Sequence, residues 1–295
     1  MVIHPLIDIT RKEKYPVIFF LLVFIVFMGC NNNERTWSTY KADATSSSYS
    51  SLREINKQNV RHLKLVWTFN PDDAAEASRF AASQCNPIII DGVMYLASAR
   101  HRIYAVNAGN GKLIWSFDPF NGGPGGGSFR GVTYWEEGKD KRILFTGGDN
   151  LFALDAQTGK PVPGFGLNGK VSMNVGMRDD PQKISIKPTS PGIVYKDLII
   201  IGNEVSELYG AQPGYIRAYN IRTGKLEWTF HTVPKPGEFD MKPGQRMPGN
   251  MPGVPTVGVD LVWMKKEGGY FSVQVLLHTI FMDMIVLAKT SLATA

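Results

Sequence analysis

Cysteine is scarce in this sequence, and its basic residues do not cluster. Only two cysteines, Cys30 and Cys85, occur among 295 residues, so neither a disulfide framework nor a zinc site with the usual cysteine spacing can form. The formal net charge is +6, and the lysines and arginines are dispersed through turns such as Gly111-Lys112 and Gly159-Lys160. A nucleic-acid surface needs a concentrated basic stripe, so this class of function is disfavoured.

Long apolar runs are missing too, apart from one short stretch near the N-terminus. This stretch extends from Val17 to Met28 and follows Arg11, Lys12 and Lys14. It is too short for a comfortable membrane span but has the length of the apolar part of a signal peptide. The pattern therefore predicts an exported protein, with the signal over residues 1–30.

Cys30 directly follows the apolar stretch and is preceded by Gly29. A small residue before a cysteine at this place resembles the lipobox of bacterial lipoproteins. We therefore expect lipid attachment at Cys30 and a periplasmic protein anchored to a bacterial membrane. Residues 31–36 are polar and have nothing to bury, which suits a tether. The alternative is an ordinary cleaved signal with an incidental cysteine, and in both cases the protein leaves the cytoplasm.

The chain contains 30 glycines and 18 prolines, which favours many short strands over long helices. Three segments also repeat one another, namely 104–115, 152–160 and 217–228. Each has a strand-like stretch that ends in Asn or Asp, a turn closed by Gly, and a following Lys. Since Gly adopts the positive φ of tight turns, each segment predicts an antiparallel hairpin.

A second hairpin is predicted ahead of each repeat. These hairpins run from Pro87 to Ala97 with a turn at Asp91-Gly92, from Val132 to Thr146 with a turn near Gly138-Lys139, and from Gly192 to Gly202 with a turn at Lys196-Asp197. Two hairpins make a four-stranded blade, and the repeat spacing is close to the ~40–50 residues of a propeller blade, with an insertion in the second interval. We therefore predict an all-β chain that forms a partial β-propeller.

Each repeat also carries a small residue and a large aromatic residue on adjoining strands. The small residues are Ala105, Ala153 and Ala218, and the large ones are Trp115, Phe165 and Trp228. A large ring docked on a small neighbour between blades buries ~150–250 Å², so we predict a structural role for these residues. A blade cannot bury its faces alone, and three blades therefore imply a longer ring or an open fragment.

The repeated unit, Ala-x-(Asn/Asp)-x-x-(Thr/Asn)-Gly-Lys-x-x-x-Trp, resembles the repeat of the pyrroloquinoline quinone (PQQ) dependent dehydrogenases. Other segments resemble the eight-bladed quinoprotein alcohol and glucose dehydrogenases in family order: Trp37–Tyr40, Tyr49–Asn56, Leu63–Phe69, Arg130–Trp135, Thr189–Gly192 and Phe230–Glu238. The resemblance covers about Thr36 to Glu238. It implies PQQ and calcium as cofactors, a sugar or alcohol substrate, and a quinone or cytochrome as electron acceptor.

The resemblance assigns three residues to cofactor binding: Gln84, Arg130 and Thr189. Arg130 stands in the Arg-Gly-Val segment, where the guanidinium can hold a PQQ carboxylate bidentately; the alternative is a surface ion pair. Thr189 stands where the family uses a hydroxyl toward the cofactor, although Thr before Ser-Pro also suits a turn. Gln84 occupies the first-blade position that reaches the cofactor edge. Cys85, beside it, is predicted to be a buried free thiol.

Glu207 stands where the alcohol dehydrogenases carry a calcium-binding glutamate, with Glu204 as the alternative in a shifted alignment. Carboxylate oxygen suits a hard cation. The sequence departs from the alcohol dehydrogenases before Arg-Gly-Val, where Ser128-Phe129 replaces an adjacent cysteine pair, and this favours the sugar-dehydrogenase-like branch. Trp135 stands where glucose enzymes can carry a histidine, so the resemblance does not identify glucose as the substrate.

The repeat pattern stops at about Met251. After a one-nucleotide shift of the reading frame, residues 254–267 can read Gly-Ala-Asn-Cys-Trp-Gly-Gly-Phe-Ser-Leu-Asp-Glu-Lys-Arg, which resembles the family's next blade, and residues 278–293 give a second such string. We therefore predict propeller blades over 37–250 and a frameshifted tail over 251–295. A membrane hairpin and an amphipathic tail are the alternatives. The family's catalytic aspartate and metal-binding asparagine would lie beyond the break.

Two main functions follow from these patterns. The first is an N-terminal fragment of an exported PQQ-dependent dehydrogenase, inactive as written. The second is a cofactor-free PQQ-repeat lipoprotein that scaffolds outer-membrane assembly, and an inert truncated product is a third reading. Arg130, Thr189 and Glu207 favour the enzyme, because a scaffold needs docking aromatics and glycines but no arginine or carboxylate near the axis.

Overall fold

The computed structural model describes residues 37–72, 84–177, 180, 184, 186–204 and 212–232, together with the backbone of three strands between residues 258 and 290. The expected signal, the tether and Cys30 lie outside these residues. Within the described part, the only helix is a short 3-10 turn, η1 (Val60–His62). No helix of that part is long and apolar enough to cross a bilayer.

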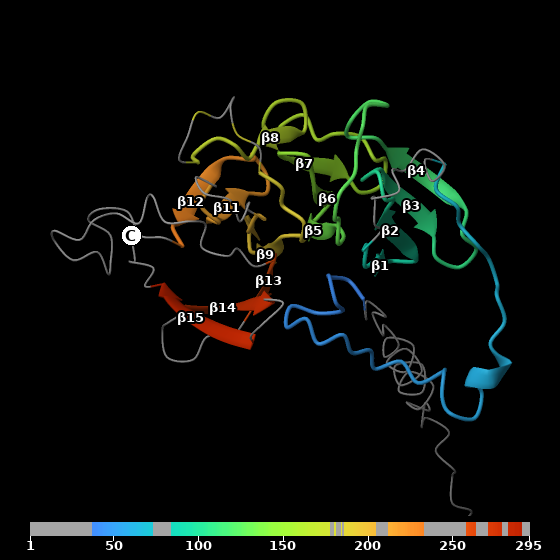
Figure 1. The fold of residues 1–295 in the computed structure, drawn as a ribbon. Coiled ribbons are helices and arrows are strands. Elements are labelled where there is room, and N and C mark those ends of the chain that lie inside the picture. Colours follow the sequence, from blue (N-terminus) through green and yellow to red (C-terminus); the bar gives the residue numbers. More distant parts are fainter. Residues whose placement is uncertain are drawn as a thin grey trace, which may run out of the picture. The chain divides into compact units, whose positions relative to one another are not determined.

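Three antiparallel sheets, each of four strands, follow one another along the chain (Figure 1). The first blade contains β1 (Ile88–Ile90), β2 (Val93–Ala97), β3 (Ile103–Asn107) and β4 (Leu113–Phe117). The second contains β5 (Thr133–Glu137), β6 (Asp140–Gly147), β7 (Asn150–Asp155) and β8 (Lys170–Ser172). The third contains β9 (Ile193–Tyr195), β10 (Leu198–Ile201), β11 (Ile216–Asn220) and β12 (Leu226–Phe230). The prediction of all-β, four-stranded blades is confirmed.

The predicted hairpin turns have the backbone that their sequences require. Asp91 and Gly92 both adopt positive φ, 50° and 77°, as a two-residue hairpin turn demands. In the first repeat, the Asn107 Oδ1 accepts hydrogen bonds from the N–H groups of Gly109 and Asn110 at 3.0 and 3.1 Å. This local bonding explains why the repeat places Asn or Asp at the end of the strand.

The second blade departs from the repeat at its last strand. A strand was expected to begin at Lys160, but the chain there makes only an isolated bridge between Leu154 and Pro161. The ladder with β7 is instead completed by β8, ten residues later in the chain. Pro161 and Pro163 explain the difference, because proline has no N–H to donate to a strand ladder.

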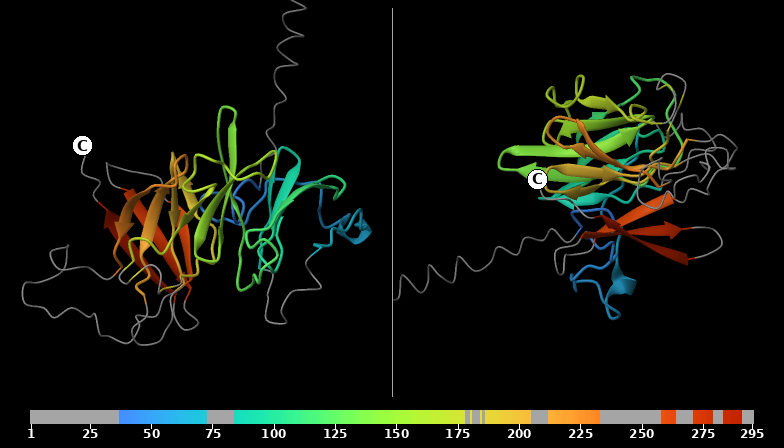
Figure 2. Two further views of the ribbon diagram at one scale, coloured as in Figure 1. Left: turned by 90° about the horizontal axis from the view of Figure 1, so that it is seen from above. Right: turned by 90° about the vertical axis from the view of Figure 1, so that its left-hand side faces the viewer.

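Consecutive blades lie face to face and share apolar cores. One core joins side chains of the first and second blades, including Ile90, Ala105 and Phe145. A second core joins the second and third blades, including Leu151 and Ile201. Two views of the ribbon show these sheets packed against one another in order (Figure 2).

The predicted docking of large rings between blades is present, but the small partner is a turn glycine and not the expected alanine. A Cβ added to Gly159 would lie 2.6 Å from the Trp115 ring, and one on Gly224 would lie 3.4 Å from the Phe165 ring. Trp115 is almost fully buried, and its indole N–H donates to the carbonyl of Ala156 at 3.0 Å. The alanine predicted as partner, Ala105, instead lies opposite Trp115 within the same blade.

The segment after Met251, which was expected to lack a blade-like alternation, contains three strands. These are β13 (Gly258–Trp263), β14 (Phe271–His278) and β15 (Asp283–Thr290), and they form an antiparallel sheet in chain order. Their many β-branched and aromatic residues favour strands even without the Gly-Lys turns of the repeat. The sheet has three strands, whereas each preceding blade has four.

Candidate functional site

The chain segments that lead into the first strand of each blade lie next to one another. Asn86, Arg130 and Thr189 stand shortly before β1, β5 and β9. The N–H of Asn86 donates to the carbonyl of Arg130 at 2.8 Å, and the N–H of Arg130 donates to the carbonyl of Thr189 at 3.0 Å. Main-chain hydrogen bonds thus bring together equivalent positions that are far apart in sequence.

The side chain of Arg130 reaches across to the third blade. Its Nη1 donates to the Oγ1 of Thr189 at 2.6 Å and, at 3.4 Å, to the Oγ of Ser190. Arg130 is half-buried and Thr189 is buried. The predicted cofactor residues Arg130 and Thr189 are therefore in direct contact, although they come from different blades.

Arg130 is held by neutral hydroxyl groups. In the described part of the chain its guanidinium has no carboxylate within ion-pair distance, so the alternative of a surface ion pair is not what the structure shows there. A guanidinium carries five N–H donors in a planar fork, and the hydrogen bonds to described residues, both from Nη1 to hydroxyl groups, use only part of that fork. Such a group can hold a carboxylate of a bound molecule.

Gly131 explains why the chain can approach so closely at this point. Its φ is +149°, and an added Cβ would lie 3.0 Å from the carbonyl oxygen of Asn86. A side chain there would press on the main-chain hydrogen bond between Asn86 and Arg130. The glycine of Arg-Gly-Val is thus required by the close contact of the first and second blades.

The other predicted site residues are not brought into this contact. Gln84 is exposed and makes no hydrogen bond with Arg130 or Thr189, although it lies only two residues before Asn86. Glu207 lies outside the described residues. Glu204, its alternative, is exposed, and its N–H pairs with the carbonyl of Lys187 at 2.9 Å. Within the described residues, no group of three or more histidine, cysteine or acidic side chains could hold a metal.

His101 is a residue of this region that the sequence did not single out. Its Nε2 lies 3.3 Å from the carbonyl of Gly127, and its ring centroid lies 4.9 Å from that of Phe129, the residue before Arg130. Burial lowers the pKa of His101, although the contact with Gly127 acts in the opposite direction. The neutral ring therefore packs beneath the glycine-rich loop that leads to Arg130. No sequence motif marks His101, since this packing joins segments remote in sequence.

Cys85 has no chemical role that its surroundings support. It is a free thiol, and its Sγ accepts a hydrogen bond from the N–H of Ala97 at 3.2 Å. Burial raises the pKa of Cys85 to about 11, so the thiolate is rare at neutral pH. The predicted free thiol is confirmed, and it is only partly exposed.

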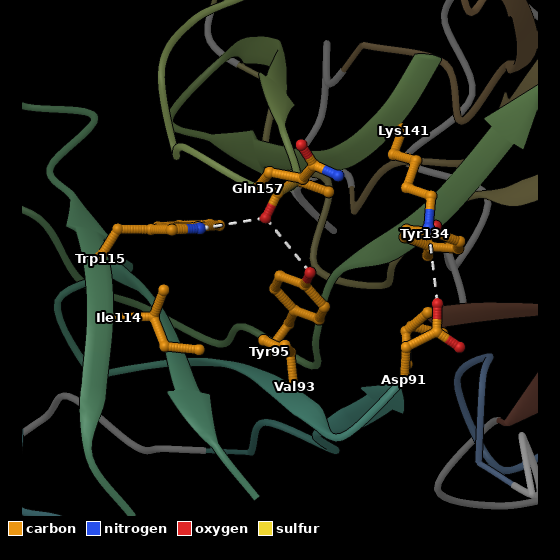
Figure 3. A pocket seen from close by; sticks show the side chains of 10 residues that line it. Asp91, Val93, Tyr95, Ile114, Trp115, Tyr134, Lys141 and Gln157 are labelled. Atoms are coloured by element: carbon orange, nitrogen blue, oxygen red, sulfur yellow. Dashed lines mark hydrogen bonds and ion pairs between the residues drawn. The ribbon is translucent and has the colours of Figure 1, made fainter. Parts of the chain in front are cut away.

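A cavity of about 260 Å³ is lined by residues of the first two blades (Figure 3). Its walls include Asp91, at the turn after β1, and Lys141, at the start of β6, whose side-chain N and O lie 3.5 Å apart. Arg130 precedes β5, whereas Lys141 pairs with the end of that strand. The cavity is therefore separate from the Arg130 contact. Trp115, one of its three aromatic wall residues, contributes to holding the first two blades together through its hydrogen bond to Ala156.

The Arg130 contact fits the cofactor that the sequence resemblance implies. PQQ is a flat quinone with carboxylate groups, and the available guanidinium fork matches a carboxylate. The Thr189 hydroxyl, which accepts from Arg130, retains a proton that it can donate. The described residues offer no comparable set for the implied calcium ion.

The sequence and the fold of this chain are both similar to those of known proteins. The sequence profile of the PQQ family described as "Glucose/ethanol/alcohol dehydrogenase, beta-propeller domain" matches residues 37–256. The dehydrogenase subunit of the quinone alcohol dehydrogenase of Gluconacetobacter polyoxogenes is 36% identical over 206 residues, which are 68% of this chain and 26% of that protein. Quinoprotein glucose dehydrogenase A of Acinetobacter calcoaceticus is 31% identical over 229 residues, or 68% of this chain and 28% of that protein.

The fold of the chain is also similar to that of a solved structure. The quinohemoprotein alcohol dehydrogenase of Comamonas testosteroni superposes with a TM-score of 0.55 and 31% identity, covering 69% of this chain and 28% of that one. The chain thus spans about a quarter of the length of the relatives it matches.

Proposed function

Because the chain belongs to the PQQ-type glucose, ethanol and alcohol dehydrogenase β-propeller family, we propose that it is the N-terminal portion of a dehydrogenase that oxidises a sugar or an alcohol. In such a reaction the alcohol group of the substrate would lose two electrons and two protons as it becomes a carbonyl, and PQQ, when bound, would supply the two-electron acceptor. The electrons would then pass to a second quinone or to a cytochrome.

The observation that carries the proposal is the contact between Arg130 and Thr189. Arg130 would bind a carboxylate of PQQ, and Thr189 would orient the guanidinium and donate a hydrogen bond from its hydroxyl group to the cofactor. A propeller that only scaffolds other proteins has no use for a half-buried guanidinium held by neutral hydroxyls. The contact therefore favours the dehydrogenase over the scaffold.

Three further parts of the proposal rest on sequence. Glu207 would contribute to a calcium site, and Cys30 would carry a lipid that anchors the exported protein. Mass spectrometry of the mature N-terminus tests the anchor, with Cys30→Ser as the variant and Cys85→Ser as its matched control. A mature protein without lipid on Cys30 would contradict the anchor and leave the dehydrogenase proposal intact.

The third part of the proposal is a shift of the reading frame near Met251. The family match ends at residue 256, close to the point where the repeat stops, which supports a frameshift near Met251. Sequencing the coding DNA tests this directly. If no one-base shift restores the two family-like strings, the frameshift idea is wrong.

The cofactor proposal is tested by adding PQQ and calcium to the purified chain and following quinone absorbance and dye reduction. We expect binding without dye reduction. Loss of a charge-assisted hydrogen bond is worth about 1.5–3 kcal/mol, so Arg130→Met should raise the Kd by roughly 10- to 150-fold. Arg130→Lys should recover only part of the affinity, because Lys lacks the planar fork.

Arg222→Lys is the matched control. Arg222 contacts Asp197 at 3.3 Å, in the β9–β10 turn at the other end of the blade, so its replacement should leave PQQ binding unchanged. Unaltered binding by Arg130→Met would refute the assignment of Arg130. Absence of PQQ binding by a longer chain with the restored frame would refute the dehydrogenase proposal itself.

A further inference from the structure

Arg217 is a fully buried arginine of the third blade. It lies on β11, and its side chain is the largest among the fully buried side chains of the described residues. Its Nη1 donates to the carbonyl of Met173 and, at 3.4 Å, to that of Val175, and both of these residues follow β8 of the second blade. The guanidinium is therefore enclosed where the second and third blades meet (Figure 1).

The repeat carries an aromatic ring at the corresponding position of the other two blades. In the three repeats, the residue before the shared alanine is Tyr104, Phe152 and Arg217. The rings of Tyr104 and Phe152 are buried and pack edge to face on phenylalanine rings from earlier in the chain. An apolar ring suits a buried position between blades, whereas a charged side chain is almost never fully buried unless it is paired. Packing alone therefore does not account for the arginine of the third blade.

Two of the three guanidinium nitrogens of Arg217 are unsatisfied within the described part of the chain. Its Nε and Nη2 are buried and have no hydrogen-bond partner there, and no ion pair of the described residues includes Arg217. The hydroxyl of Tyr219, two residues further along β11, is also buried without a partner, and the Tyr219 ring centroid lies 5.7 Å from the Arg217 Cζ. A buried cation without a counter-charge is strongly unfavourable, so this edge of the guanidinium requires a negative group.

Arg142 shows what the same edge of a buried guanidinium binds when a partner is present. It is 7% exposed, and its Nη1 also donates to two carbonyls, those of Ile221 and Arg222, at 2.8 and 3.0 Å. Its Nε and Nη2 donate to Oδ1 and Oδ2 of Asp140 at 2.8 and 2.7 Å. Both arginines thus use Nη1 for main-chain carbonyls, and in Arg142 a carboxylate binds the edge that in Arg217 has no partner among the described residues.

The ionisation of the two unsatisfied groups favours an anion. Burial lowers the pKa of Arg217, but a guanidinium is not deprotonated in proteins, so the charge is retained at neutral pH. Burial raises the pKa of Tyr219, although the positive charge of Arg217 acts in the opposite direction, so the hydroxyl keeps its proton and can donate it in a hydrogen bond. The side chains therefore offer donors and a positive charge, and no acceptor that a cation would need.

We propose that Arg217 binds a small carboxylate-type anion through its Nε and Nη2, in the bidentate geometry that Asp140 adopts on Arg142. A planar group with two oxygens matches the two parallel N–H donors, which a spherical halide does not. Because Arg217 is fully buried and Tyr219 is 2% exposed, the ligand is enclosed and must be small, as formate, acetate and bicarbonate are. This site is independent of the cofactor contact at Arg130.

Urea unfolding in the presence of formate tests the proposal on the 295-residue chain. Sodium formate replaces sodium chloride at constant total salt, so that the ionic strength does not change. A ligand that binds only the folded state shifts the unfolding equilibrium by mass action, so the ratio of folded to unfolded protein should rise about tenfold for each tenfold rise in formate above its Kd. Formate has only three non-hydrogen atoms, which limits its Kd to about 0.5 mM or weaker, and the series should therefore extend to about 100 mM.

Two matched variants identify the site. Arg217→Met removes the proposed donor edge and should abolish the response to formate. Arg142→Met removes another buried arginine, whose edge already binds Asp140, and should keep the response although its unfolding midpoint is lower. A response of the same size in Arg217→Met would overturn the proposal, because the anion would then bind elsewhere. A wild-type chain whose stability does not depend on formate would also overturn it.

A measurement on the wild-type chain decides the matter if Arg217→Met does not fold. In protein labelled with 15N-arginine, the Nε–H signal of Arg217 should move with the same formate dependence as the unfolding equilibrium, while that of Arg142 should stay in place. Arg217→Lys and Arg142→Lys assign the two signals. An Arg217 signal that does not move would overturn the proposal. None of these measurements contains PQQ, so a failure of cofactor binding does not affect them.

Discussion

The docking of Trp115 on Gly159 gives the sharpest test of how the blades hold together. We consider Gly159→Ala. The φ of Gly159 is +70°, which costs a residue with a Cβ about 1–2 kcal/mol. The new Cβ would also lie 2.6 Å from the Trp115 ring, and displacing a packed ring costs about 1–3 kcal/mol more. We therefore expect a loss of about 2–5 kcal/mol in the free energy of unfolding.

Gly138→Ala separates the two contributions. Gly138 also has positive φ, +59°, but an added Cβ meets nothing within 4 Å. This variant should lose only the conformational part, about 1–2 kcal/mol. The gain from restricting the unfolded chain is the same in both variants and cancels in the comparison.

Urea unfolding followed by tryptophan fluorescence and circular dichroism measures both variants, provided that the two probes give coincident transitions. A third measurement adds Trp115→Leu to each variant, because a smaller side chain relieves the contact at Gly159 but not at Gly138. We expect a coupling of about 1 kcal/mol or more for the Gly159 pair and near zero for the Gly138 pair. Equal losses for the two glycine variants would refute the steric argument.

Three other predictions concern buried polar groups. Arg142 is 7% exposed and donates from Nη1 to the carbonyls of Ile221 and Arg222 at 2.8 and 3.0 Å, so Arg142→Met should lower the unfolding free energy by about 2–4 kcal/mol in urea titrations. The pKa of His101 is lowered by burial, so the unfolded chain binds the proton more readily; stability should fall as pH drops below about 6.5, and less so in His101→Gln. With a pKa of about 11, Cys85 should react with a disulfide reagent at pH 8 about 200-fold more slowly than an exposed cysteine, and a rate near that of a free thiol would contradict its burial.

The turns of the blades could be predicted because they depend on neighbouring residues. Asp91-Gly92 and Lys196-Asp197 form the turns that their sequences indicate, with positive φ at Asp91, Gly92 and Lys196. The last strand of the second blade could not be placed in the same way. The chain leaves the strand ladder of β7 after an isolated bridge at Pro161. The position at which it rejoins that ladder as β8 depends on packing over a longer stretch of the chain.

The candidate site was predictable in its residue types but not in its contacts. Motifs identify Arg130 and Thr189, yet the two lie 59 positions apart in the sequence, and no local pattern indicates that one side chain bonds to the other. Likewise, the partner of the Trp115 ring is Gly159 in the next blade, because ring docking joins surfaces that the sequence does not place side by side. His101 carries no motif at all and is revealed only by its packing on Phe129.

The main-chain bonds from Asn86 to Arg130 and from Arg130 to Thr189 have a consequence for how such a site can change. They fix the spacing of three positions without using any side chain. Substitutions of the Arg130 or Thr189 side chain can therefore change the chemistry of this contact while leaving its main-chain positions in place. An engineer could diversify these two residues on a constant backbone, and Gly131 is the neighbour that such a library should leave untouched.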